Sequence, residues 1–149
     1  MLIAIIGENC AGKSTLAEAV KAELGGEVMT GKDYLRMAKS EAEAERLFRV
    51  KLQNAAAGAG ESIIYVISEK EHIALLPVGA VRVLVYCDLD TIKERFSARM
   101  RGNLPLPVEK MLEAKHGAFD GGEYEYRFDG GSGGAEEFAK NLVMELEKC

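Results

Sequence analysis

Near its start the chain carries a run of small and polar residues, GENCAGKST at positions 7–15, between two apolar segments. Gly7 and Gly12 let the backbone turn tightly, so that several N–H groups can point toward one centre. Lys13 adds a long cationic side chain and Ser14 adds a hydroxyl. Backbone donors, an ammonium and a hydroxyl together suit a polyphosphate and its Mg²⁺ ion.

The spacing of this run, GxxxxGKS, matches the phosphate-binding P-loop. The context also matches, because a continuous apolar run at residues 2–6 predicts a buried strand before it. Apolar residues at helical spacing follow from Lys13, and the start of that helix places a positive dipole end at the loop. We predict that ATP binds here, with Lys13 at the β- and γ-phosphates and Ser14 as the Mg²⁺ ligand. The predicted binding residues of the loop are Gly7, Glu8, Asn9, Cys10, Ala11, Gly12, Lys13, Ser14 and Thr15.

Strand and helix patterns alternate along the rest of the chain, which is typical of a doubly wound parallel sheet. We predict a single α/β domain over residues 1–149, a three-layer α/β/α P-loop NTPase fold with a mostly five-stranded parallel sheet. The predicted strands are 2–6, 27–29, 62–67, 81–86 and 124–128. The predicted helices begin at or near residues 13, 40, 68, 91, 107 and 135.

Several local expectations accompany this pattern. Residues 68–71 (SEKE) have the form of a capping box, which predicts a short helix to about residue 76. Asp90 or Thr91 is expected to cap the helix that follows the fourth strand. His72 and His116 are expected on helix surfaces, because neither has cysteine or histidine neighbours at metal-ligand spacing.

Composition excludes some classes of function. The net charge is −5 and no long basic stripe is present, so sequence-independent nucleic-acid binding is not expected. No apolar stretch approaches the length that crosses a bilayer, and the first six residues are too short for a signal-peptide core. Three widely spaced cysteines fit a reducing compartment. We therefore expect a soluble, cytoplasmic protein.

Beyond the P-loop, two segments resemble the small P-loop kinases, the group of adenylate, guanylate, shikimate and gluconate kinases. VMTGKDYLR at 28–36 is similar to the stretch after their second strand, where an acidic residue and an arginine border the phosphate acceptor. TIKERFSARMR at 91–101 resembles their lid-start helix, which implies a short lid at about 100–122. The resemblance implies an ATP- and Mg²⁺-dependent phosphotransferase with a small-molecule acceptor.

Two arginines of the second segment, Arg95 and Arg99, lie four residues apart and so share one helical face. Guanidinium groups are suited to the charge that spreads over oxygens during phosphoryl transfer. By resemblance, Arg95 stacks near adenine, while Arg99 and Arg101 approach the phosphates. YRFDGG at 126–131 resembles the last strand and loop of nucleoside monophosphate kinases, which implies that Asp129 and Gly130 border the base.

The acceptor side is less defined by sequence. Asp33 follows the second strand, where it could orient or deprotonate an acceptor hydroxyl, or instead cap a helix. Arg36 and Arg49 are candidates for gripping an acidic group of the acceptor. The third strand ends without the usual Walker B aspartate, so support for Mg²⁺ would come from Ser14 together with Asp33 or Glu69.

We predict catalytic roles for Lys13, Asp33 and Arg99 in a kinase that phosphorylates a nucleotide or nucleoside, or a shikimate- or gluconate-like metabolite. The alternative is a P-loop ATPase or nucleotide-binding switch that acts through a protein partner. The absent Walker B aspartate favours that alternative. The paired arginines favour the kinase, because a closing lid excludes water from phosphoryl transfer.

Overall fold

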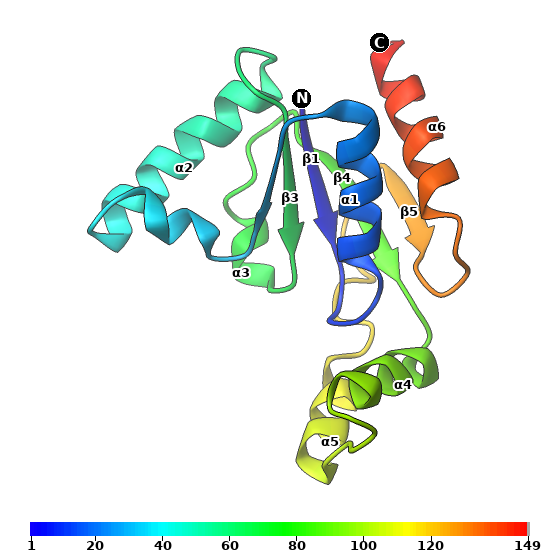
Figure 1. The fold of residues 1–149 in the computed structure, drawn as a ribbon. Coiled ribbons are helices and arrows are strands. Elements are labelled where there is room, and N and C mark those ends of the chain that lie inside the picture. The colour runs from blue at the N-terminus through cyan, green and yellow to red at the C-terminus, as the bar shows by residue number, and fades with distance from the viewer. Residues whose placement is uncertain (149) are drawn as a thin grey trace.

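The computed structural model describes residues 1–148, which are built around a sheet of five parallel strands (Figure 1). The order across the sheet is β2-β3-β1-β4-β5, and every neighbouring pair is parallel. The strands are β1 (Leu2–Ile6), β2 (Glu27–Thr30), β3 (Ile63–Ile67), β4 (Val81–Tyr86) and β5 (Tyr126–Asp129). The predicted five-stranded parallel sheet is confirmed.

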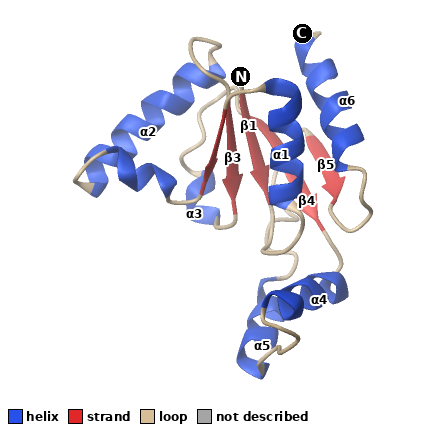
Figure 2. Cartoon of the chain, in the orientation of Figure 1, coloured by secondary structure: helices blue, strands red, loops and turns tan. Residues whose placement is uncertain are grey.

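Helices connect the strands and cover both faces of the sheet, which gives the predicted three layers (Figure 2). They are α1 (Lys13–Leu24), the 3₁₀ helix η1 (Asp33–Met37), α2 (Glu41–Ala56), α3 (Lys70–Ile73), α4 (Leu89–Arg99), α5 (Leu106–Lys115) and α6 (Ala135–Glu147). Within residues 1–148, none of these helices combines the length and the apolar character needed to cross a membrane.

Alternation along β1 divides the core into two halves. Ile3 and Ile5 are fully buried on the side of α1 and α6, whereas Ala4 and Ile6 are fully buried on the side of α2. A strand covered on both faces needs apolar residues at every position, which explains the unbroken run that predicted it. The chain order reverses across β1, and such a switch point is where open α/β sheets bind ligands, beyond the carboxyl ends of their strands.

The predicted start of the helix after β4 is wrong, for a local reason. Asp88 caps α4, because its carboxylate accepts hydrogen bonds from the backbone N–H and hydroxyl of Thr91 at 3.0 and 2.8 Å. The helix therefore begins before Asp90. The helix predicted to begin near residue 107 is α5, which begins at Leu106 and ends at Lys115.

The predicted capping box at residues 68–71 does not form. α3 begins at Lys70 after Glu69, without a side-chain capping bond in the described chain, and it spans only four residues. His72 lies in this short helix and is buried, with 4% exposure, rather than on a helix surface. The apolar surfaces of Tyr34 and Tyr65 surround its ring, which accounts for the burial.

The chain between β4 and β5 carries α4 and α5 beyond the carboxyl ends of the strands, away from the layers (Figure 1). Lys93 of α4 contacts Glu109 and Glu113 of α5 at 3.3 and 3.5 Å, so the two helices are joined by ion pairs. Of the two helices, α5 lies within the region predicted as a lid, whereas α4 ends just before it.

Where β5 ends, the backbone comes very close to the loop after β1. A Cβ atom added to Gly130 would lie 1.6 Å from the carbonyl oxygen of Ala11, closer than any real contact. Glycine at position 130 is therefore required by the approach of two backbone segments, and the sheet edge at β5 helps to position the P-loop.

This close approach gives a test of the fold. We expect Gly130→Ala to lower the free energy of unfolding by at least about 2 kcal/mol, because backbone must move to accept the methyl group. Gly121→Ala is the matched control, since a Cβ there meets no atom within 4 Å. Urea denaturation of the two variants measures the difference, and equal stability would contradict the account.

Candidate active site

The loop between β1 and α1 has the conformation that phosphate binding requires. Cys10 and Gly12 have positive φ angles of 64° and 112°, which turn successive peptide groups. Gly12 stands at the start of α1, where no side chain of the described residues caps the helix and its first turn holds no acidic residue. The first N–H groups of α1 are thus available to an anion.

Lys13 lies at the centre of this loop with only 6% exposure. Its ammonium donates a hydrogen bond to the backbone carbonyl of Glu8. Burial, reinforced by the nearby charge of Arg99, lowers the pKa of Lys13 to about 8, although Cys10 and Glu8 act in the opposite direction. A buried ammonium without a bound carboxylate is poised to gain stabilisation from an anion.

Arg95 of α4 holds two backbone segments together. Its guanidinium donates to the carbonyl of Cys10 at 3.0 Å and to the carbonyl of Gly130 at 2.7 Å. Arg95 therefore joins the P-loop to the turn after β5, next to the close approach of Gly130 to Ala11. The sequence pointed to Arg95 as a partner for adenine and gave no signal for this backbone contact.

A cavity of about 430 Å³, here called the P-loop cavity, opens over the start of α1. Arg99 of α4 lines this cavity, as do Ser14 and Thr15 in the first turn of α1, which are exposed. Its lining residues are Asn9, Cys10, Gly12, Lys13, Ser14, Thr15, Thr30, Val66, Ser68, Arg95, Arg99, Phe128, Gly130, Gly133 and Ala135. Most of the predicted nucleotide-binding residues are brought together here.

Some predicted nucleotide-binding residues lie elsewhere. Gly7 and Ala11 shape the loop from behind, since Ala11 is fully buried and a Cβ on Gly7 would lie 2.3 Å from the carbonyl oxygen of Val85. Asp129 closes its own turn by accepting from the N–H of Gly131 at 2.9 Å. Arg101 follows the end of α4, is exposed and is not part of the P-loop cavity lining.

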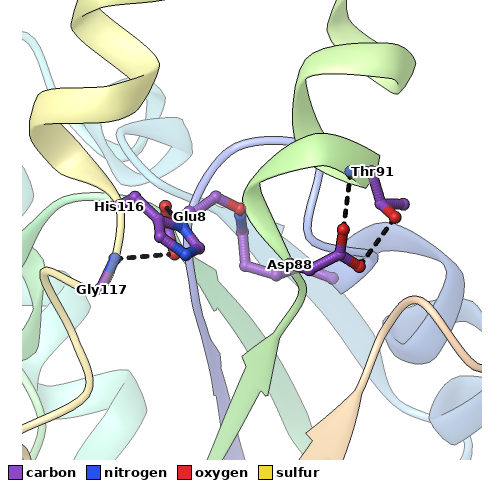
Figure 3. Close-up of polar contacts among 6 residues, drawn as sticks. Glu8, Asp88, Thr91, His116 and Gly117 are labelled. Atoms are coloured by element: carbon purple, nitrogen blue, oxygen red, sulfur yellow. Dashed lines mark hydrogen bonds and ion pairs between the residues drawn. The ribbon is translucent and has the colours of Figure 1, made fainter.

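The side chain of Glu8 lies beside His116 and Gly117 (Figure 3). Its carboxylate contacts Nδ1 of His116 at 3.1 Å and accepts from the backbone N–H of Gly117 at 3.2 Å. His116 is therefore not a free helix-surface residue but part of a link between the P-loop and the segment after α5. The partners lie more than one hundred positions apart in the sequence, where no local pattern could reveal the pairing.

A second cavity of about 470 Å³, here called the α5 cavity, adjoins the first, and Asn9 and Ser68 line both. It lies between the P-loop, the segment after β3 and α5. Its lining residues are Glu8, Asn9, Ser68, Glu69, Lys70, Glu71, Met111, Leu112, Lys115, Ala118 and Phe119. Sequence reasoning singled out only Glu8, Asn9 and Glu69 of this set.

The residues predicted to hold an acceptor line neither cavity. The Asp33 carboxylate accepts from the N–H of Thr30 at 2.9 Å and pairs with Arg36 at 3.3 Å, which closes the turn after β2. The helix cap considered as an alternative for Asp33 is wrong, because η1 begins at Asp33 itself after Lys32 and no side chain of the described residues caps it. Arg49 donates to the carbonyl of Ala74 at 3.3 Å and so joins α2 to the end of α3.

The residues present fit a triphosphate with Mg²⁺. The P-loop cavity offers N–H groups at a helix start, the buried cation of Lys13 and the exposed hydroxyl of Ser14. Glycine at position 12 keeps the P-loop cavity open, because a Cβ atom there would lie only 3.2 Å from the Cα of Gly130.

Comparison with known proteins bears on the fold. No protein-family model matches the chain, and no curated protein sequence matches it significantly. Solved structures do match over nearly the whole chain. A shikimate kinase from Acinetobacter baumannii in complex with shikimate has a TM-score of 0.65 and 18% identity, and the match covers 98% of this chain and 92% of that one.

Two further structures are similar. A sugar kinase from Janibacter sp. HTCC2649 has a TM-score of 0.63 and 20% identity, with 97% of this chain and 93% of that one covered. A gluconokinase from Sinorhizobium meliloti 1021 has a TM-score of 0.58 and 16% identity, with 97% and 96% covered. The predicted resemblance is thus confirmed at the level of the fold, which is that of the small P-loop metabolite kinases.

Proposed function

We propose that this protein is an ATP- and Mg²⁺-dependent kinase that transfers the γ-phosphate to a hydroxyl group of a small metabolite. One observation carries the proposal: the P-loop cavity, with Lys13 and Arg99, shares the lining residues Asn9 and Ser68 with a second cavity of similar volume. Two adjoining cavities of this kind suit a donor and an acceptor held together, which is most of what phosphoryl transfer requires of a protein.

On the donor side, the triphosphate would lie on the N–H groups at the start of α1. Lys13 would reach the β- and γ-phosphates, and Ser14 would hold Mg²⁺, which bridges phosphate oxygens and offsets their charge when bound. Arg99 would face the transferring group from α4. The base would lie toward Gly130 and Gly133, which line the same cavity beyond Arg95.

On the acceptor side, we place the substrate in the α5 cavity rather than beside Asp33. Its lining combines the carboxylates Glu69 and Glu71, the ammonium groups Lys70 and Lys115 and an apolar surface from α5. The solved structures with this fold include shikimate, sugar and gluconate kinases, so a hydroxylated metabolite comes first among candidates. A nucleoside or nucleotide is the second class to test.

The experiment is a search for acceptor-dependent ADP release. The protein is incubated with ATP, Mg²⁺ and separate pools of sugars, hydroxy acids, nucleosides and nucleoside monophosphates. ADP formed only with one pool, together with a phosphorylated product of matching mass, supports the kinase. Slow hydrolysis that no pool accelerates would contradict it and favour the ATPase or switch alternative.

Two arginines at the end of α4 allow a matched test of the transfer step. We expect Arg99→Ala to lower kcat by about 10²- to 10³-fold, because one fixed cation beside the transferring phosphate is lost. Arg101→Ala should change kcat less than about threefold, since Arg101 is exposed and is not among the residues that line the P-loop cavity. A similar loss of kcat in both variants would show that Arg99 is not the residue that lies beside the transferring phosphate.

The lowered pKa of Lys13 leads us to expect that nucleotide binding depends on pH. Its pKa is lowered to about 8 by burial, and phosphate would favour the charged form. MgATP binding at pH 8 should therefore take up about half a proton, and affinity should fall by up to tenfold per pH unit above 8. Calorimetry in buffers of different ionisation enthalpy measures the uptake. In Lys13→Arg, whose side chain does not titrate in this range, this uptake should disappear.

A further inference from the structure

The segment after β3 brings together three side chains that can bind a metal ion. One ligand atom each of Glu69, Glu71 and His72 lie within 4.8 Å of one another. Nε2 of His72 is 3.7 Å from a carboxylate oxygen of Glu71, too far for a hydrogen bond. Glu69 and Glu71 also line the α5 cavity, so this cluster lies at the wall of the proposed acceptor site.

His72 is the unusual member of this cluster. Its side chain is 6% exposed, and Nδ1 is buried without a hydrogen-bond partner among residues 1–148. The rings of Tyr34 and Tyr65 pack against it, with centroids 6.4 Å away in each case. A buried imidazole normally has partners for its nitrogens. Here packing holds the ring in place, with Nε2 3.7 Å from a carboxylate oxygen of Glu71 and Nδ1 on the opposite, buried side of the ring.

Glu69 and Glu71 each offer a carboxylate oxygen, and these two oxygens lie within 4.8 Å of one another. Two carboxylates this close repel one another when both are ionised, and a shared cation removes that repulsion. The ends of both side chains are exposed, which leaves them free to adjust.

We propose that Glu69, Glu71 and His72 bind one divalent transition-metal ion, with Zn²⁺ or Co²⁺ as the best fit. Imidazole and carboxylate ligands suit these ions better than Mg²⁺, which prefers oxygen alone. Ligand atoms around tetrahedral zinc lie about 3.3 Å apart, so the two glutamates need only a small movement toward His72. The fourth position would face the α5 cavity and remain open to water or to an oxygen of a bound molecule.

This site goes beyond the proposed kinase function, and it assigns Glu69, one of two carboxylates considered as support for the Mg²⁺ at Ser14, to a different ion. Ser14 lines the P-loop cavity, whereas Glu69 and Glu71 line only the α5 cavity. The test needs neither nucleotide nor acceptor, so the metal site can fail while the kinase assignment stands. The reverse also holds.

The protein, first freed of metal with a chelator, is titrated with Zn²⁺ and with Co²⁺ by calorimetry in the presence of excess Mg²⁺. We expect one ion per chain, and X-ray absorption of the zinc form should show nitrogen and oxygen ligands without sulfur. Glu69→Gln and Glu71→Gln should each weaken binding at least about tenfold, and His72→Gln should abolish it. Glu61→Gln is the control, because Glu61 is exposed and outside the cluster.

Because His72 is part of the core, its variant is judged only if circular dichroism shows a folded protein. If His72→Gln is not folded, the result depends on Glu69→Gln and Glu71→Gln, whose side chains are exposed. The proposal is overturned if no ion binds, if Mg²⁺ competes equally, or if Glu71→Gln and Glu61→Gln bind zinc alike. A thiolate charge-transfer band in the cobalt form would also overturn it, since the metal would then be bound by a cysteine.

Discussion

Two cations hold the carbonyl groups of the P-loop, and the rest of the site depends on this contact. Lys13 donates a hydrogen bond to the carbonyl of Glu8, and Arg95 donates one to the carbonyl of Cys10. A peptide group whose C=O is turned one way presents its N–H the other way, so these bonds favour a loop whose donors face the cavity. Arg95 reaches the loop from α4 and also bonds Gly130 after β5. Segments distant in sequence are therefore needed to shape a motif that looks local.

The nucleotide-binding side of the site could be predicted from sequence, because the residues that form it are contiguous in the chain. Gly12, Lys13 and Ser14 are adjacent, and the apolar run before them and the helical spacing after them follow from local physics. The sheet was equally predictable, since buried parallel strands leave unbroken apolar runs. Here the structure brings together what the sequence pattern indicated.

The acceptor side could not be predicted in the same way, because it is assembled from tertiary contacts. Asp33 follows a strand, as many reactive carboxylates do, yet a neighbouring N–H and Arg36 hold it in a turn. His72 has the polarity of a surface residue, but two tyrosines from other elements enclose it. The contact between Glu8 and His116 depends on the path of the chain through α4 and α5. Residue type and spacing carry none of this information.

The link between Glu8 and residues 116–117 has a thermodynamic consequence. The chain from α4 to the end of α5 is attached to the body near both ends, by Arg95 at one and by His116 and Gly117 at the other. Movement of this part of the chain over bound ligands would then be confined to the stretch between these attachments. A short tethered stretch has few conformations to lose, so closure would cost little entropy and would leave most of the binding free energy for holding the ligands.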